Sequence, residues 1–300
     1  MRSEDDHFVV GLIGAGIGSS LSPPLHEREA DAQGLRYLYQ LIDLTALGLP
    51  PGDVGELVKS ARQLGFRGLN ITYPCKQEVV KYLDDLSAEA AELGAVNTVV
   101  FAHGRAAGHN TDRYGFAESF RRGLPGAATG RVILIGAGGA GAAVAYAMHG
   151  LGAGRLTVVD ADADRADRLA EALTAAGATA DTATVAGVAE RLATADGLIN
   201  ATPVGMAAHP GLPVPIAALR PGTWVADIVY RPLETDLLRS ARALGCRTLD
   251  GGGMVVHQAA ESFRLFTGRD PDVERMLRHL AVLTGGGSDA GGSDAGGFDA

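Results

Sequence analysis

The chain has 300 residues, of which 46% are hydrophobic and 42 are glycine, and its formal net charge at pH 7 is -9. This length is sufficient for two domains, each with its own core. An acidic chain offers no basic stripe to replace phosphate counterions, so we expect no nucleic acid partner. The two cysteines, Cys75 and Cys246, lie far apart in the sequence. This spacing indicates neither a disulfide framework nor a structural zinc site, and no other metal site is expected.

The N-terminal sequence Met-Arg-Ser-Glu-Asp-Asp-His is too acidic, and the apolar run after it too short, for a secretory signal. With the cysteine usage, this favours a cytoplasmic location. Residues 132–148 are almost entirely small or apolar, but their glycines and alanines fit a strand, a turn and a buried helix better than a membrane span, so no membrane partner is expected. Residues 285–300 repeat Gly, Ser and Asp and are predicted to be a disordered tail.

The first half of the chain alternates strands with helices. Apolar runs predict strands over residues 8–13, 37–42 and 68–71. Apolar positions three and four apart predict helices over residues 24–33 and 53–64.

The second half continues the alternation after a helix that runs from Asp112 through Arg122 and ends in a Leu-Pro-Gly turn. Its predicted strands are residues 132–135, 156–159, 198–201, 224–228 and 247–249, and a helix follows over 254–266. The predicted fold class is therefore α/β, with an N-terminal α/β substrate-binding domain, a Rossmann-type dinucleotide-binding domain and a ligand cleft between them. The expected boundaries are residues 8–112 with 252–284 for the first domain and 113–251 for the second.

A glycine-rich turn follows the strand over residues 132–135. Gly136, Gly138 and Gly141 form a GxGxxG pattern that opens an alanine-rich helix. One glycine allows the tight turn, one lets the backbone approach a pyrophosphate, and one lets the helix pack close to the strand. The pattern predicts a dinucleotide cofactor at the helix N-terminus. A similar run at Gly14 lacks the third glycine, which disfavours a second such site.

Asp160 ends the next strand, 24 residues after Gly136, where a carboxylate can accept from both ribose hydroxyls. The same carboxylate, with Asp162 beside it, would repel a 2′-phosphate, so the sequence favours NAD over NADP. Alternatively, these two aspartates cap the next helix, which carries Arg165 in its first turn.

Polar clusters stand in the first half where packing residues would be expected. Ser20 and Ser22 can both donate to one carboxylate, although serine before proline is also helix-cap chemistry. Lys76 stands in a proline-fixed loop, either as a catalytic group or as a solvated lysine. Asn97 and Asp112 flank a hairpin-like segment and could come close, or the Asn110-Thr111-Asp112 run could be an N-cap. A nucleophilic role for Cys75 is disfavoured because no base is evidently paired with it.

Taken together and in this order, the motifs resemble those of the shikimate dehydrogenases. They are Ser20-x-Ser22-Pro, Asn70-x-Thr72-x-Pro-x-Lys76, Gly94-Ala-Val-Asn-Thr98, Asn110-Thr-Asp112, the glycine-rich turn, Asn200-Ala-Thr-Pro-Val-Gly-Met206, Asp227-x-x-Tyr230-x-Pro232 and Gly253-Met254-x-x-x-Gln258. The chain looks most like the NAD-preferring quinate/shikimate dehydrogenases, because NADP-using members carry Asn-Arg-Thr/Ser where this chain has Asp160-Ala161-Asp162.

The resemblance implies that Lys76 and Asp112 are the catalytic pair. It implies that the substrate is bound by Ser20 and Ser22 at its carboxylate, by Thr72, Asn97 and Gln258 at its ring hydroxyls, and also by Tyr230. For the NAD cofactor it implies contacts from Gly136, Gly138, Gly139, Ala140, Asp160, Arg165, Thr202, Pro203, Val204, Met206, Val229, Gly251 and Met254. Ser22 replaces the threonine of many quinate-oxidising members and so favours shikimate.

The implied reaction is NAD-dependent oxidation of shikimate to 3-dehydroshikimate, with quinate as a possible second substrate. Oxidising a secondary alcohol moves a hydride to the nicotinamide and a proton to a base. Lys76 and Asp112 are the groups expected to transfer the proton. Two alternatives stay open, a dehydrogenase of an aminated analogue and a non-catalytic NAD- or shikimate-binding sensor. A homodimer is a possible assembly.

Overall fold

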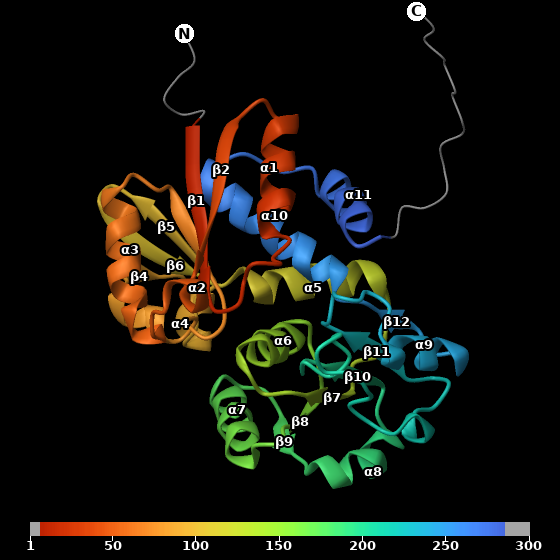
Figure 1. Cartoon of the computed structure of the whole chain (residues 1–300). Helices are drawn as coiled ribbons and strands as arrows, with labels where there is room; N and C mark the ends of the chain where they lie inside the picture. Colours follow the sequence, from red (N-terminus) through yellow and green to blue (C-terminus); the bar gives the residue numbers. More distant parts are fainter. Residues whose placement is uncertain (1–6, 286–300) are drawn as a thin grey trace, which may run out of the picture.

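The structure, a computed structural model, describes residues 7–285 and contains two α/β units, each built on a six-stranded sheet (Figure 1). The first sheet lies in the upper part of Figure 1 and the second in the lower part. The predicted two-unit α/β fold is confirmed. The predicted tail, apart from Gly285, lies outside the described residues.

The first sheet is mixed, with the strand order β2-β1-β3-β5-β6-β4. Its strands are β1 (His7–Gly14), β2 (Arg36–Asp43), β3 (Gly68–Ile71), β4 (Asp85–Leu86), β5 (Thr98–Ala102) and β6 (Arg105–His109). The three predicted strands match β1, β2 and β3 to within two residues at each end. Strands β5 and β6 pair antiparallel. The hairpin-like segment between Asn97 and Asp112 is therefore a true hairpin.

The helices of the first unit come from both ends of the chain. They are α1 (Ser22–Ala32), α2 (Leu44–Leu47), α3 (Val54–Gln63), α4 (Ala88–Leu93), α10 (Gly252–Thr267) and α11 (Val273–Leu283), with 3-10 turns η2 (Pro51–Asp53) and η3 (Glu78–Tyr82). The sequence patterns did not single out α11. Its Arg275 donates through Nε and Nη2 to the buried carboxylate of Glu29 on α1, at 2.8 and 2.7 Å. This ion pair fixes the C-terminal helix on the first unit.

The second sheet is entirely parallel, with the strand order β12-β11-β10-β7-β8-β9. This is the order of a Rossmann dinucleotide-binding fold. Its strands are β7 (Arg131–Ile135), β8 (Arg155–Val159), β9 (Ala180–Thr182), β10 (Gly197–Asn200), β11 (Trp224–Asp227) and β12 (Thr248–Leu249). The helices around it are α6 (Gly139–Gly150), α7 (Ala163–Ala175), α8 (Val188–Leu192) and α9 (Asp236–Ala243), with 3-10 turns η4 (Val185–Gly187) and η5 (Ile216–Ala218).

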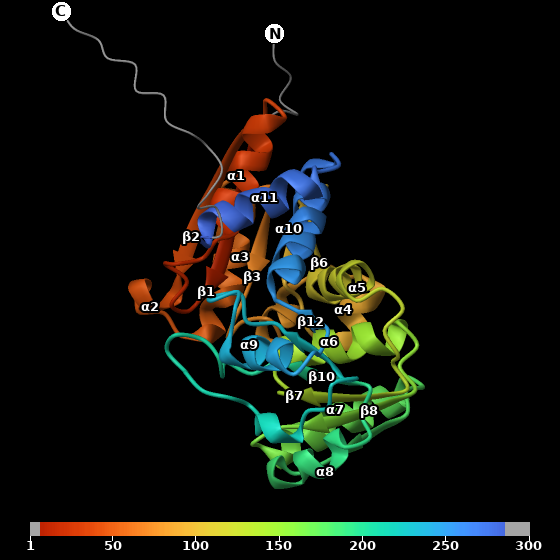
Figure 2. The ribbon, with the colours of Figure 1, turned by 90° about the vertical axis from the view of Figure 1, so that its right-hand side faces the viewer.

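Helix α5 (Thr111–Gly123) joins the two units and lies against α10 on one side and α6 on another (Figure 2). Its approach to α10 is close, because a Cβ at Gly115 would lie 2.7 Å from the Met254 carbonyl oxygen. Phe116, Phe120 and Met254 are buried in one cluster with the core of the second sheet. Helices α5 and α10 thus pack together between the two units. The first turn of α5 faces the space between the sheets. No helix within residues 7–285 is long and apolar enough to cross a membrane.

Candidate active site

A cavity of about 490 Å³ lies between the two units, with lining residues from both. Many residues singled out in the sequence, distant from one another along the chain, meet around it. These are Ser20, Ser22, Thr72, Lys76, Asn97, Asp112, Ala140, Thr202, Pro203, Met206, Val229, Tyr230, Met254 and Gln258. Loops after strands of both sheets and the first turns of α5, α6 and α10 contribute to the lining, as expected for a cleft at the carboxyl ends of parallel strands.

The remaining predicted residues do not line this cavity. They are Gly136, Gly138, Gly139, Asp160, Arg165, Val204 and Gly251. Gly251 is packed under the loop that follows β11, because a Cβ there would lie 2.4 Å from the Ile228 carbonyl oxygen. The Val204 carbonyl accepts from Asn200 Nδ2 at 2.9 Å, so Val204 holds its loop in place through the backbone.

Lys76 and Asp112, which both line the cleft, form an ion pair. Lys76 Nζ lies 2.5 Å from Asp112 Oδ2, and the exposed fractions of the two side chains are 19% and 10%. Lys76 comes from the loop after β3, whereas Asp112 lies in the first turn of α5. Asn110 caps that helix by accepting from Arg113 N, so the N-cap interpretation of this run is also correct.

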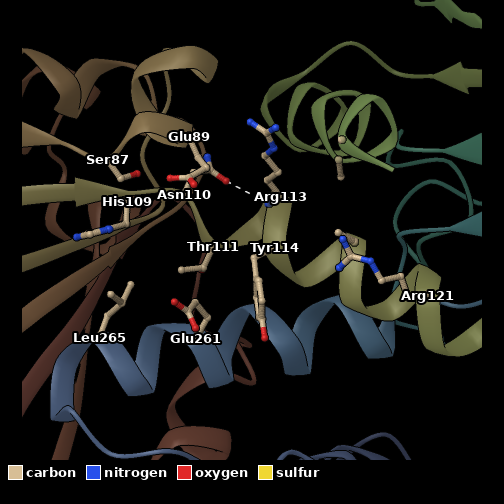
Figure 3. A pocket seen from close by; sticks show the side chains of 13 residues that line it. Ser87, Glu89, His109, Asn110, Thr111, Arg113, Tyr114, Arg121, Glu261 and Leu265 are labelled. Atoms are coloured by element: carbon tan, nitrogen blue, oxygen red, sulfur yellow. Dashed lines mark hydrogen bonds between the residues drawn. The ribbon is translucent and has the colours of Figure 1, made fainter. Parts of the chain in front are cut away.

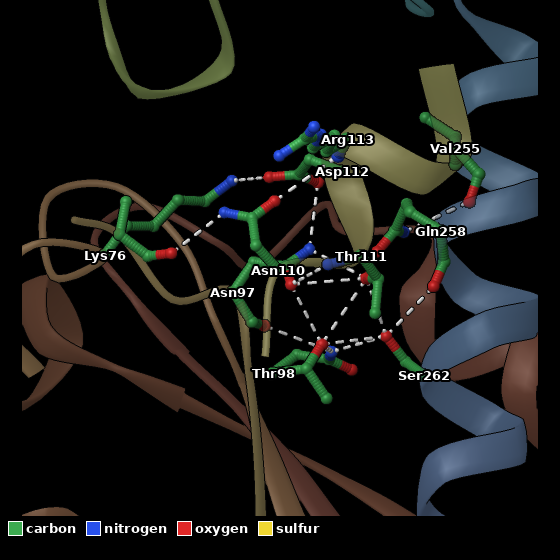
Figure 4. A network of polar contacts seen from close by, with 12 residues as sticks. Lys76, Asn97, Thr98, Asn110, Thr111, Asp112, Arg113, Val255, Gln258 and Ser262 are labelled. Carbon is green, nitrogen blue, oxygen red and sulfur yellow. Dashed lines mark hydrogen bonds and ion pairs between the residues drawn. The ribbon is translucent and has the colours of Figure 1, made fainter. Parts of the chain in front are cut away.

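Asn97 fixes the other oxygen of the Asp112 carboxylate (Figure 4). Its Nδ2 donates to Asp112 Oδ1 at 2.9 Å. Its Oδ1 accepts from Thr111 N at 2.7 Å and from Thr98 Oγ1 at 3.0 Å. Because donors already face Oδ1, the amide can point only its NH₂ group toward the carboxylate. Asp112 is therefore held at both oxygens, by an ammonium and by an oriented amide.

A buried polar network behind this pair was missed by sequence reasoning. Ser262 Oγ lies 2.9 Å from Thr98 Oγ1 and 3.1 Å from both Thr111 Oγ1 and Asn70 Nδ2. The Tyr39 hydroxyl donates to Asn70 Oδ1 at 2.7 Å, and burial raises its pKa, so it stays a protonated donor. Asn70, Thr98 and Thr111 belong to motifs that the sequence offered, but nothing in the local pattern of α10 marks Ser262.

The glycine-rich turn between β7 and α6 has the geometry that its three glycines predict. Gly136 has φ = +99°, and a Cβ at Gly141 would lie 1.9 Å from the Gly136 carbonyl oxygen. A Cβ at Gly138 would meet nothing within 4 Å, and no side chain caps the start of α6. The turn thus leaves open space in front of the helix N-terminus, which fits the pyrophosphate of a dinucleotide.

Asp160 is anchored to this turn. Its Oδ2 accepts from Ala137 N at 2.7 Å, its Oδ1 accepts from Asp162 N at 2.9 Å, and Arg165 Nη1 lies 3.5 Å from the same Oδ1. Asp162 caps α7 by accepting from Arg165 N. The capping alternative is therefore correct for Asp162, whereas Asp160 is bound to the glycine-rich turn. Two carboxylates and one guanidinium leave a net negative charge at the end of β8.

The loops after β10 and β11 both contribute to the cavity lining, and both are bound to the buried side chain of Asp227. Its carboxylate accepts from Thr235 Oγ1 at 2.8 Å, Asn200 Nδ2 at 3.0 Å and Val229 N at 3.1 Å. Burial raises the pKa of Asp227, and these hydrogen bonds act against that rise. Asn200 also accepts from Thr202 Oγ1. The loops after β10 and β11 are therefore held by one hydrogen-bonded network.

A second hollow and a buried cysteine do not form a comparable site. A hollow of about 380 Å³ on the far side of α5 contains Arg113, Arg121 and Glu261 (Figure 3), but all three are already in ion pairs, with Glu92, Glu118 and Arg264. Cys75 is fully buried, and burial raises its thiol pKa.

In the first glycine-rich run, which begins at Gly14, backbone N–H groups bind a side chain of the protein itself. Gly16 N and Ile17 N each donate to the carboxylate of Asp43 at 2.9 Å. No group of three or more His, Cys, Asp or Glu within residues 7–285 could hold a metal ion.

Models of protein families and similar proteins show which family this chain belongs to. Residues 12–99 match the model for the shikimate dehydrogenase substrate binding domain, 119–207 match shikimate / quinate 5-dehydrogenase, and 251–281 match the shikimate 5'-dehydrogenase C-terminal domain. The chain is 62% identical over 287 residues to a Streptomyces avermitilis protein named shikimate dehydrogenase (NADP(+)), covering 93% of this chain and 97% of the relative. The chain belongs to the shikimate dehydrogenase family.

Relatives in the shikimate dehydrogenase family carry both cofactor names. A Corynebacterium efficiens protein named quinate/shikimate dehydrogenase (NAD(+)) is 51% identical, over 90% of this chain and 96% of the relative. The structure of quinate dehydrogenase from Corynebacterium glutamicum in complex with NAD superposes with a TM-score of 0.88 at 46% identity, covering 93% of this chain and all of that one. The family resemblance and the predicted fold are thus both confirmed.

Proposed function

We propose that this chain catalyses the reversible, NAD-dependent oxidation of shikimate to 3-dehydroshikimate, with quinate as a second substrate oxidised to 3-dehydroquinate. The single observation that carries the proposal is the position of the Lys76–Asp112 pair. It lines the same cavity as Ala140 and Thr202, and Gly139 lies beside Lys76, since a Cβ on Gly139 would be 3.9 Å from Lys76 Cδ. A proton-transfer pair therefore stands beside the predicted cofactor turn. Relatives named for shikimate and for quinate support the substrate class.

The residues of the cleft suit this chemistry. A bound nicotinamide dinucleotide accepts the hydride that leaves the substrate carbon. The hydroxyl proton must leave at the same centre. Lys76 is placed to take it when its side chain is the neutral amine, and the ammonium so formed returns the proton in the reductive direction. Asp112 holds the ammonium in place and is itself oriented by Asn97.

The proposed substrate contacts follow the two sides of the cavity. Ser20, Ser22 and Tyr230 would hold the carboxylate, and Thr72, Asn97 and Gln258 would bind ring hydroxyls, since all six line the cavity. Ser22 N already donates to Ser20 Oγ at 3.2 Å, which holds the two serines on one short turn. Burial raises the pKa of Tyr230, so its hydroxyl remains a donor at neutral pH.

The preference for NAD is carried by Asp160. Its carboxylate is fixed at the carboxyl end of β8, where ribose hydroxyls meet this fold. Arg165 would favour a 2′-phosphate if it were free, but it lies within 3.5 Å of Asp160 and 3.3 Å of Asp162. The net negative charge there supports NAD over NADP, and so does the NAD complex of the Corynebacterium glutamicum enzyme.

The test is the initial rate of NAD reduction by the purified chain, followed by the absorbance of the reduced nicotinamide, with shikimate and separately with quinate. We expect turnover with both and a higher kcat/KM for shikimate. No turnover with either substrate, while NAD still binds, would overturn the proposal in favour of an aminated substrate or a non-catalytic sensor.

A further inference from the structure

The charges that line the cleft do not cancel. Three lining residues are charged, namely Lys76, Asp112 and Arg231. Lys76 and Asp112 neutralise each other through their 2.5 Å ion pair. Arg231 takes part in no ion pair with any residue from 7 to 285. The lining therefore carries one uncompensated positive charge, which complements a substrate with a single carboxylate.

Arg231 also bridges the two units. It follows β11 in the second unit, and its Nη1 donates to the carbonyl oxygen of Ser19 in the first unit at 2.7 Å. Ser19 directly precedes Ser20, on a loop that Asp43 holds at its other end through Gly16 and Ile17. The guanidinium thus lies at the turn that bears the proposed carboxylate-binding serines. Only one of its five N–H donors is used in this contact.

We propose that Arg231 is a specificity-determining residue that binds the substrate carboxylate, an inference that rests on the proposed function. Ser20, Ser22 and Tyr230 supply neutral donors, whereas Arg231 supplies the charge. Hydrogen bonds to an ionised carboxylate are about twice as strong as those between neutral groups, and Arg231 alone adds a full opposite charge and the fork of donors that matches a carboxylate. The carboxylate keeps its charge throughout the reaction, so this contact stabilises the bound substrate and the transition state alike. Arg231 therefore sets KM more than kcat.

The experiment compares shikimate with its uncharged methyl ester in wild type, Arg231→Gln and Arg231→Lys. We expect Arg231→Gln to raise KM for shikimate about ten- to a hundredfold, the range for a hydrogen bond to a charged group, with kcat within about twofold. KM for the ester should hardly change. Arg231→Lys, which keeps the charge, should recover most of the affinity for the acid.

A matched control separates charge from general effects of losing an arginine. Arg247 makes the same kind of contact, donating through Nη2 to the Pro125 carbonyl at 3.0 Å, but does not line the cleft. Arg247→Gln should leave both KM values unchanged.

Two results would overturn the proposal for Arg231. One is an equal loss for acid and ester in Arg231→Gln, which would make Arg231 a mechanical bridge alone. The other is a KM for shikimate in Arg231→Gln that equals the wild-type value. Absence of shikimate oxidation by the wild-type enzyme would instead refute the proposed function on which the inference rests.

Discussion

Lys76 and Asn97 hold opposite oxygens of one carboxylate: Lys76 Nζ lies 2.5 Å from Asp112 Oδ2, and Asn97 Nδ2 donates to Oδ1 over 2.9 Å. The three side chains come from the loop after β3, the entry to β5 and the first turn of α5. The position of the ammonium therefore depends on the packing of α5 as well as on its own loop.

Replacing Lys76 by methionine tests whether this pair transfers the proton. Methionine keeps the unbranched apolar stem and removes the ammonium, so we expect kcat to fall by about 10²–10⁴-fold, the usual contribution of general acid–base catalysis. The dissociation constant for NAD, measured by calorimetry, should change by less than about threefold, which is about 0.7 kcal/mol. Wild-type turnover in Lys76→Met would remove the lysine from the mechanism.

A pair of glycine substitutions tests the turn between β7 and α6. Gly141→Ala should prevent stable folding of the second unit, because the added methyl group would lie 1.9 Å from the Gly136 carbonyl oxygen. Gly138→Ala should fold normally, since its methyl group meets no protein atom within 4 Å, but should weaken dinucleotide binding by entering the pyrophosphate space. Thermal unfolding and NAD calorimetry of both variants provide the check. Unchanged NAD affinity in Gly138→Ala would place the pyrophosphate elsewhere.

Asp160→Ala should reduce the preference of the enzyme for NAD over NADP. We expect kcat/KM for NAD to fall by about 10- to 100-fold, because the ribose loses a hydrogen bond to a charged group, while the value for NADP falls less or rises. The control is Asp272→Ala, which removes the N-cap of α11 in the first unit and costs about 1 kcal/mol of stability but leaves the charges at the end of β8 unchanged. If the NAD to NADP ratio is the same in wild type and Asp160→Ala, Asp160 does not bind the ribose.

Buried histidines predict a loss of stability in acid. His26 is 1% exposed, its ring nitrogen lies 3.0 Å from the Tyr37 hydroxyl, and burial lowers its pKa from 6.5 to about 3. Between those values the unfolded chain binds a proton that the folded chain does not, so stability is full above pH 6.5 and falls as the pH drops. The slope from this one group reaches about 1.4 kcal/mol per pH unit.

His26→Gln should therefore flatten the decline in the free energy of unfolding between pH 6 and 4, measured by urea denaturation. The slope should not vanish, because burial also lowers the pKa of His257. His7→Gln, at an exposed strand end, is the control. An identical slope in wild type and His26→Gln would mean that the ring is protonated in the folded protein.

The sequence predicted the individual turns and strands of this site better than the contacts between distant segments. The glycine spacing predicted the turn at Gly136 because each glycine answers a local backbone requirement that the structure confirms. The short strands β4 and β9 escaped prediction, since two or three residues without an apolar pattern give no periodic signal.

Contacts between distant segments were harder to predict. Ser262 lies 151 residues from Thr111 and meets it only because α10 returns to the first unit. Arg231 is an unassigned position between Tyr230 and Pro232 in the sequence motif, and its position at Ser19 follows from how the two units pack together. Neither relationship has a local pattern in the sequence. Lys76 and Asp112, by contrast, each belong to a motif that indicates a catalytic role.

The most direct test of this account is the oxidation of saturating shikimate by the wild-type chain with varied NAD and, separately, varied NADP. We predict a kcat/KM for NAD at least about tenfold above that for NADP, a difference of about 1.4 kcal/mol. Equal or faster reduction of NADP would contradict the role assigned to Asp160, and no reduction of either cofactor would contradict the proposed reaction itself.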